Sequence, residues 1–136
     1  MTKAFRAPPD PFPAQYSHTA KGNCLGSIIP DGSILFHDVE APIKAGDIVT
    51  VWLREESFKS GSQIRTKILI ALSSETITLA ALNPPEQHVF PRKAFHAVHK
   101  VLAIKEPSGA IRDLRTTEAC LDLFARALGQ IGVPCA

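Results

Sequence analysis

The chain has 136 residues, of which 45% are hydrophobic and 21% charged, and its formal net charge is +2. These values fit one globular domain with one hydrophobic core, and a small charge without a basic run argues against direct nucleic-acid binding. Because no apolar stretch approaches the roughly 20 residues that span a bilayer, and the first residues lack the apolar core of a secretory signal, we expect a cytoplasmic protein without a membrane segment.

The first half of the chain is predicted to form an arm and three short strands. Prolines fix φ and remove hydrogen-bond donors, so they favour an extended arm over residues 1–15. Strands are expected at Gln15–Thr19, at 33–38 and at Ile48–Leu53. The last of these has the clearest alternation of β-branched residues. A loop or short helix around 24–29 and a Pro-Asp-Gly turn at 30–32 are expected between the first two strands.

The second half is predicted to add further strands and one helix. The polar segment 54–62 is typical of a hairpin connection. Strands are expected at 63–72, 75–82 and 94–105, with a brief pairing at 88–91. Two prolines in Asn83-Pro84-Pro85 end the strand before them, because proline cannot continue a ladder. Apolar residues on one helical face predict a helix at 116–129. The predicted fold is mostly β, with short twisted antiparallel strands and one C-terminal helix.

The cysteines and histidines do not form a recognisable metal or disulfide pattern. The cysteines are Cys24, Cys120 and Cys135. Their number is odd and no CxxC or Cys/His spacing occurs, so each is expected to be a free thiol. His96 and His99 are three residues apart on a predicted strand, a spacing that would turn them to opposite faces. We therefore expect surface or hydrogen-bonded core histidines and no metal ion.

Two signatures with glycine and aspartate stand in order along the chain. The first is Gly22-Asn23-Cys24-Leu25 followed by Pro30-Asp31-Gly32, and the second is Gly46-Asp47-Ile48-Val49. A lysine follows in Thr66-Lys67-Ile68-Leu69, and a turn follows in Leu82-Asn83-Pro84. Their order and spacing resemble the peptidase domain of the LexA-like self-cleaving serine peptidases, which include LexA, UmuD and related phage repressors. The resemblance covers about residues 16–105.

This resemblance implies a LexA/signal-peptidase-like β-fold for residues 16–136, preceded by the proline-rich arm at 1–15. The family uses a serine nucleophile and a lysine general base. Cys24 falls on the position of the serine, and Lys67 falls on the position of the lysine. The family also implies a homodimer, a protein partner such as a repressor or a DNA polymerase of the SOS response, and no cofactor.

The replacement of serine by cysteine changes the chemistry that the site would support. A Ser/Lys dyad works because desolvation can lower the pKa of a lysine by several units, and Lys67 is expected to be partly buried between apolar strand residues. A thiol, with an ordinary pKa of about 8.5, needs less help from a base. Its larger sulfur is poorly placed for an oxyanion hole suited to oxygen.

The expected function follows from this replacement and from what the chain lacks. No helix-turn-helix pattern precedes the motif, and the arm contains no Ala-Gly bond of the kind that the family cleaves. We therefore expect a regulatory or assembly protein with weak or lost self-cleavage. The alternative is an active peptidase that uses Cys24 and Lys67 as nucleophile and base.

Simpler roles remain open for the residues of the motif. Cys24 can be a small semi-buried hydrophobe or a redox-sensing thiol. Lys67 can be a solvated strand residue that pairs with Glu75 across a hairpin. Ser27 is three positions out of register with the nucleophile.

Three further features have structural interpretations. Asp31 and Asp47 each adjoin a glycine and are expected to hold turns. Trp52 is expected to pack in the core or in a dimer contact. The helix at 116–129 is expected to pack on the sheet, with an oligomer contact as the alternative.

Overall fold

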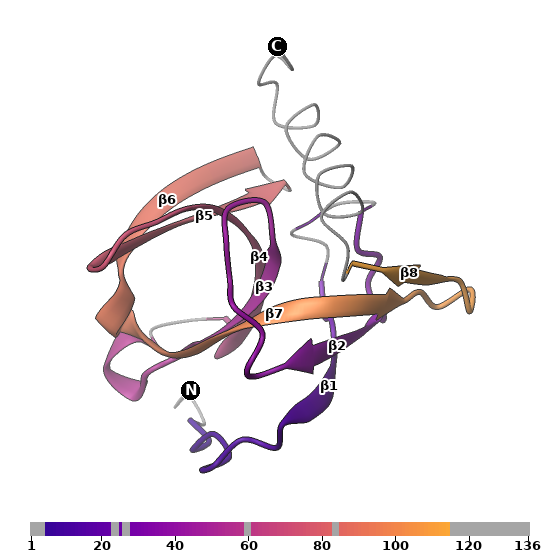
Figure 1. Ribbon diagram of the computed structural model, residues 1–136, viewed down its shortest axis with the longest axis horizontal. Helices are drawn as coiled ribbons and strands as arrows, with labels where there is room; N and C mark the ends of the chain where they lie inside the picture. Colours follow the sequence, from indigo (N-terminus) through magenta and orange to yellow (C-terminus); the bar gives the residue numbers. More distant parts are fainter. Residues whose placement is uncertain (1–4, 23–24, 26–27, 59–60, 83–84, 115–136) are drawn as a thin grey trace.

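The computed structural model describes residues 5–22, 25, 28–58, 61–82 and 85–114. These residues form eight strands in one antiparallel sheet and two single-turn 3₁₀ helices (Figure 1). The strands are β1 (Gln15–Thr19), β2 (Ile34–Asp38), β3 (Ile48–Leu53), β4 (Ile64–Leu72), β5 (Thr76–Leu82), β6 (Pro85–Pro91), β7 (Phe95–Lys105) and β8 (Ile111–Asp113). The 3₁₀ helices are η1 (Glu55–Ser57) and η2 (Arg92–Ala94). The prediction of a mostly-β fold is confirmed, whereas Cys24, Ser27, Cys120, Cys135 and the predicted helix at 116–129 lie outside the described residues.

Strand β7 connects the two halves of the sheet. The strand order is β1-β2-β7-β3-β4-β5-β6, and β8 pairs only with β7. The first half of β7 pairs with β3, and its second half pairs with β2 and β8. In Figure 1, β3 to β6 curl into a strongly bent body, while β1, β2 and β8 gather around the far end of β7.

Strand β3 is buried along its whole length because a hydrophobic core packs on each of its faces. Ile48 belongs to one core, together with Leu35, Ile104 and other residues of the loop and strand ends. Val49 and Val51 belong to the other core, with Leu69, Leu79 and Phe95 among their neighbours. Successive side chains of this strand point to opposite faces, so the β-branched residues that predicted the strand pack into two different cores.

The observed strands match the predicted ones closely, with two differences at the margins. Strand β6 is longer than the brief pairing expected, because proline is tolerated at the ends of an edge strand and Pro85 and Pro91 occupy those ends. Strand β8 was not predicted, since three residues are too short for an alternation to be recognised. A turn that contains Gly109, with a φ of 95°, connects β7 to β8.

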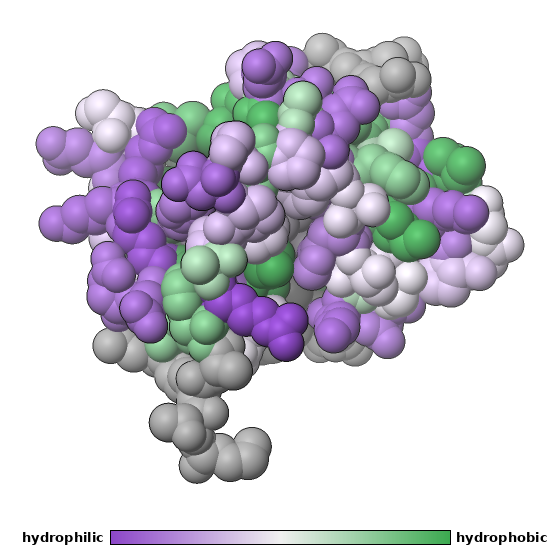
Figure 2. All heavy atoms as spheres, turned by 90° about the horizontal axis from the view of Figure 1, so that it is seen from below, coloured by the Kyte–Doolittle hydropathy of each residue, from purple (hydrophilic) through white to green (hydrophobic). Residues whose placement is uncertain are grey.

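The outer surface is mostly hydrophilic on the side where the arm lies in Figure 1. Figure 2 shows this side with polar side chains over most of it and smaller apolar areas between them. None of the residues that the structure describes belongs to a helix long and apolar enough to cross a membrane.

Candidate functional site

The loop between β1 and β2, which contains Cys24, is fixed at both ends by hydrogen bonds. The Ala20 N–H donates to the Ser33 carbonyl at 2.8 Å, so the two strands close the base of the loop. Above this, the Gly22 N–H donates to the Asp31 carboxylate at 2.6 Å. Gly22 has a φ of 84°, a conformation that glycine adopts without strain. The predicted turn role of Asp31 thus includes a bond across the loop, from the Pro-Asp-Gly turn to the first glycine of the motif.

A second anchor holds the middle of the same loop. Leu25 is buried, and its carbonyl accepts a hydrogen bond from the Ile28 N–H at 3.2 Å. The Arg112 guanidinium of β8 donates to the Ile28 carbonyl. The same guanidinium lies 3.3 Å from the Glu106 carboxylate. Arg112 was not predicted to touch this loop, because the contact joins segments that only the sheet brings together.

Lys67 lies on β4 at a point where the side chain is partly buried, as predicted. Its backbone pairs with Val49 of β3. The β4–β5 register pairs Ile68 with Ala80, and Glu75 lies in the turn beyond the end of β4. The alternative in which Lys67 pairs with Glu75 across the hairpin is therefore wrong, because the two residues are far apart along the ladder.

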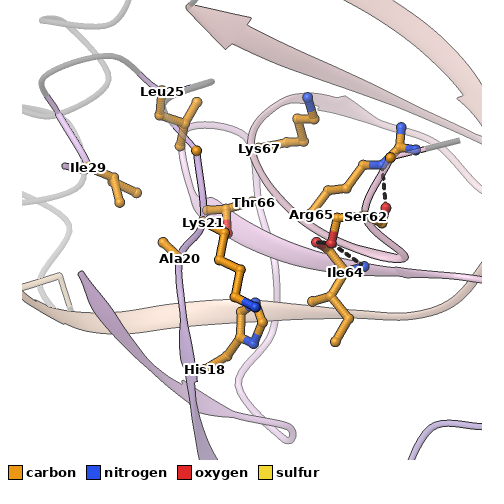
Figure 3. Close-up of a pocket in the computed structure, with 12 residues that line it drawn as sticks. His18, Ala20, Lys21, Leu25, Ile29, Ser62, Ile64, Arg65, Thr66 and Lys67 are labelled. Atoms are coloured by element: carbon orange, nitrogen blue, oxygen red, sulfur yellow. Dashed lines mark hydrogen bonds between the residues drawn. The ribbon is translucent and has the colours of Figure 1, made fainter. Parts of the chain in front are cut away.

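A cavity of about 550 Å³ lies between the Cys24 loop and β4. Lys67 lines it together with Gly22 and Leu25, which stand on either side of Cys24 in the sequence. In Figure 3 the Lys67 side chain rises from β4 at the same end of the cavity as Leu25. The structure thus places the candidate base beside described neighbours of the candidate nucleophile, although Cys24 itself is outside the described residues.

The walls of this cavity combine cations with aliphatic side chains. Lys21, Arg65 and Lys67 line it, and no aspartate or glutamate is among its described lining residues. Burial and the charge of Lys21 lower the pKa of His18, a further lining residue, so its imidazole is neutral at pH 7. Figure 3 shows the Lys21 side chain directed toward the His18 ring. The aliphatic lining residues are Ala20, Leu25, Ile29 and Ile64.

The second signature forms a turn closed by a fully buried carboxylate. Asp47 is completely inaccessible, and its Oδ2 accepts the Lys44 N–H at 2.8 Å, which confirms its predicted role in a turn. Its Oδ1 lies 3.5 Å from the Lys100 Nζ of β7, a separation that makes an ion pair without a hydrogen bond. The Gly46 N–H donates to the Leu69 carbonyl at 2.8 Å, so this turn is also bonded to β4.

A cluster of histidine and aromatic rings joins the arm to β1, β3 and β7. The Trp52 Nε1–H donates to the Tyr16 hydroxyl at 3.0 Å, and that hydroxyl lies 2.7 Å from His99 Nδ1. With Nδ1 of His99 assigned as the unprotonated ring nitrogen, the Tyr16 hydroxyl accepts from Trp52 and donates its own proton to His99. Burial raises the pKa of Tyr16 to about 12, and burial followed by the charge of His96 lowers the pKa of His99. Trp52 is buried in this cluster, as its predicted core role requires.

His37 is the most buried histidine of the cluster. Its ring stacks on that of Tyr16 with centroids 4.4 Å apart. Nδ1 lies 3.4 Å from the Tyr16 carbonyl, and Nε2 lies 2.6 Å from the Thr50 hydroxyl. A carbonyl can only accept, so the assigned tautomer has its proton on Nδ1 and accepts from Thr50 at Nε2. Burial, the largest effect, lowers the pKa of His37 to about 4.

The expectation that His96 and His99 point to opposite faces is wrong. Both rings contact Phe12 of the arm, with centroids 6.0 Å and 4.7 Å away. The reason is a β-bulge: Trp52 pairs with Ala97 and Leu53 with Phe95, which leaves His96 as the extra residue and breaks the alternation. The described part of the chain contains no group of three or more histidine, cysteine, aspartate or glutamate side chains placed to hold a metal ion.

Comparison with known proteins adds no family to this picture. No protein-family model matches the chain, and no curated protein is significantly similar to it in sequence.

Proposed function

We propose that this chain is a LexA-like peptidase-fold protein that acts as a regulatory or assembly protein, with weak or lost self-cleavage. The cavity between the 20–33 loop and β4 would be its peptide-binding cleft. Cys24 would stand at the nucleophile position of that cleft and Lys67 at the base position.

The observation that carries this proposal is the shared lining of the cavity. Lys67 and the two described neighbours of Cys24, Gly22 and Leu25, line one space although more than forty positions of sequence separate them from the lysine. The resemblance to the LexA-like peptidases implied that these positions would lie close together, and the shared lining supports the proposal.

The position of the arm favours binding in trans over self-cleavage. The Arg6 N–H donates to the Gln63 side chain at 3.1 Å, and the Gln63 amide donates back to the Arg6 carbonyl at 2.7 Å. Phe12 packs against Trp52 and His99. Of the described arm residues 5–14, none lines the cavity. The cleft would therefore receive a segment of another molecule, as a regulatory partner requires.

An active Cys24/Lys67 peptidase is the second candidate, and the same cavity supports it. In that case the Cys24 thiolate attacks the carbonyl carbon of a bound peptide. The C–N bond breaks to leave a thioester, and the departing amine takes a proton from the Lys67 ammonium. Water then hydrolyses the thioester and regenerates the thiol.

Two measurements on one set of proteins separate these candidates. In a background with Cys120→Ser and Cys135→Ser, the rate of Cys24 alkylation is followed against pH, and the intact mass is followed over days from pH 7 to pH 10. We expect the chain to stay intact. We also expect Lys67→Gln to shift the alkylation profile toward the ordinary thiol pKa of about 8.5, because a nearby ammonium stabilises the thiolate.

The control is Lys105→Gln, which removes an exposed lysine outside the cavity. If the alkylation profile does not respond to Lys67→Gln, or responds equally to the control, the proposed site is wrong. Cleavage of the parent chain that disappears in Cys24→Ala would replace the regulatory proposal with the peptidase.

A further inference from the structure

The charge of the cavity points to the kind of segment that it accepts. Three cationic side chains line it, from two different parts of the chain: Lys21 from the loop, and Arg65 and Lys67 from β4. The Arg65 Nε donates to the Ser62 carbonyl at 2.7 Å, which fixes the direction of that side chain at the cavity wall. A concave wall with charges of one sign concentrates ligands of the opposite sign.

No described aspartate or glutamate lines this cavity. Asp31 accepts a hydrogen bond from the Gly22 N–H, and it is not among the residues that line the cavity. Glu86 lies beyond β4, where a second cavity of about 270 Å³ is lined by Arg65, Lys67 and β5–β6 residues. There its carboxylate is 3.5 Å from the His88 ring. The cavity beside the 20–33 loop is therefore lined by three cationic side chains and by no described carboxylate.

The aliphatic residues of the lining favour an acidic peptide over other anionic ligands. Ala20, Leu25, Ile29 and Ile64 offer apolar contacts that suit side chains such as leucine. Single-stranded nucleic acids are usually held by aromatic rings on which bases stack. No phenylalanine, tyrosine or tryptophan is among the described residues of this lining. The combination suits a peptide that carries both carboxylates and aliphatic side chains.

We propose that the cavity selects an acidic peptide segment, with glutamate or aspartate side chains held by Lys21, Arg65 and Lys67 and aliphatic side chains against Leu25 and Ile29. The inference rests on the proposed function, because it takes the cavity to be a peptide cleft. It adds the chemical class of the segment and assigns a specificity role to Lys21.

The test compares fluorescent peptides of one length that differ only in charge. One alternates glutamate with leucine, and its partner has glutamine in place of every glutamate. Binding to the full chain with Cys24→Ala is measured by anisotropy at low and high salt. We expect the glutamate peptide to bind more tightly and to lose its advantage as salt screens the charges. We expect Lys21→Gln to weaken its binding by about threefold to fivefold, while Lys105→Gln leaves it unchanged.

Each other outcome overturns the inference in a recognisable way. Equal affinity for the two peptides would remove the charge selectivity but leave the peptide cleft. Binding of polyphosphate or an oligonucleotide, with no binding of either peptide, would show an anion site of another class. If nothing binds while the alkylation of Cys24 still depends on Lys67, the acidic-peptide inference fails and the proposed site remains.

Discussion

At the scale of single residues, Tyr16 is the side chain on which most of the buried polar cluster depends. Its hydroxyl accepts from Trp52 and lies 2.7 Å from His99 Nδ1, and its ring stacks on His37. A buried polar group that loses its hydrogen-bond partner destabilises the fold, because its hydrogen bonds to water in the unfolded chain are no longer replaced. Tyr16 therefore connects edge strand β1 to β3 and β7 through bonds as well as through packing.

Replacing Tyr16 with phenylalanine should destabilise the fold by about 1–3 kcal/mol, because the Trp52 N–H and His99 Nδ1 are both left without this partner. Urea unfolding followed by circular dichroism measures the change. Ser17→Ala, on the same strand with an exposed hydroxyl, is the control and should change the free energy of unfolding by less than about 0.5 kcal/mol. A Tyr16→Phe protein as stable as the parent would show that water replaces the hydroxyl.

Sequence reasoning reached some of these residues and missed others for a physical reason. Lys67 was singled out by the resemblance to the LexA-like peptidases, and the fold places it on the lining of the same cavity as Gly22. The bond from Tyr16 to His99 joins strands far apart in the sequence, and no local pattern of residue types marks it. A lone tyrosine on a short strand gives no sign of its hydrogen-bond partner.

At the scale of elements, the turn before β3 and the middle of β7 are tied together by a buried charge. Asp47 is wholly inaccessible, and Lys100 is 8% exposed. The sequence predicted the turn from Gly46-Asp47, but the cation that neutralises the aspartate is supplied by a distant strand. A buried ion pair is weak evidence for stability, whereas the loss of one partner leaves a buried charge without compensation.

Lys100→Met should therefore destabilise the fold by about 3–5 kcal/mol. Adding Asp47→Asn should recover part of this loss, because the asparagine oxygen can still accept from the Lys44 N–H and no charge remains to be buried. A double-mutant cycle by chemical denaturation measures the coupling between the two positions. Lys105→Met, at the exposed end of the same strand, is the control. Additive effects in the cycle would mean that the pair contributes nothing as a pair.

The strands themselves could be predicted more fully than their pairing. Alternation and β-branched residues identified β3, β4, β5 and β7. Each of these strands buries at least one face, and a buried face requires apolar residues at regular positions in the sequence. The bulge at His96 could not be predicted, since it depends on how β7 accommodates β3. The order β1-β2-β7-β3 likewise arises from packing among segments that are not neighbours in the chain.

At the scale of the whole molecule, the arm, β1 and the main sheet meet at two histidines that are held neutral. Phe12 packs on His99, and His37 lies beneath Tyr16. Protonation at Nε2 of His37 would remove the acceptor for the Thr50 hydroxyl and place a charge in a buried site. The region where the arm packs on the sheet is thus expected to be destabilised by acid.

This arrangement sets the direction of the pH dependence of stability. Burial lowers the pKa of His37 from 6.5 to about 4, so between these values the unfolded chain binds the proton more readily than the folded one. Neutral His37 therefore makes its full contribution to the free energy of unfolding above about pH 6.5. This contribution is lost as the pH falls toward 4, and it changes no further below that pH. The difference of pKa corresponds to about 3 kcal/mol, and His99, whose pKa is also lowered, acts in the same direction.

We expect the free energy of unfolding, measured with urea from pH 8 to pH 4, to fall through this window, and the fall to be shallower in His37→Gln. Glutamine cannot take up the proton, so the difference between the two curves isolates the contribution of His37 from that of the carboxylates. His88→Gln removes an exposed histidine and should leave the slope unchanged. If His37→Gln were as acid-sensitive as the parent chain, other titrating groups would have to account for the acid sensitivity of the fold. Histidine burial at the base of the arm would then have no part in it.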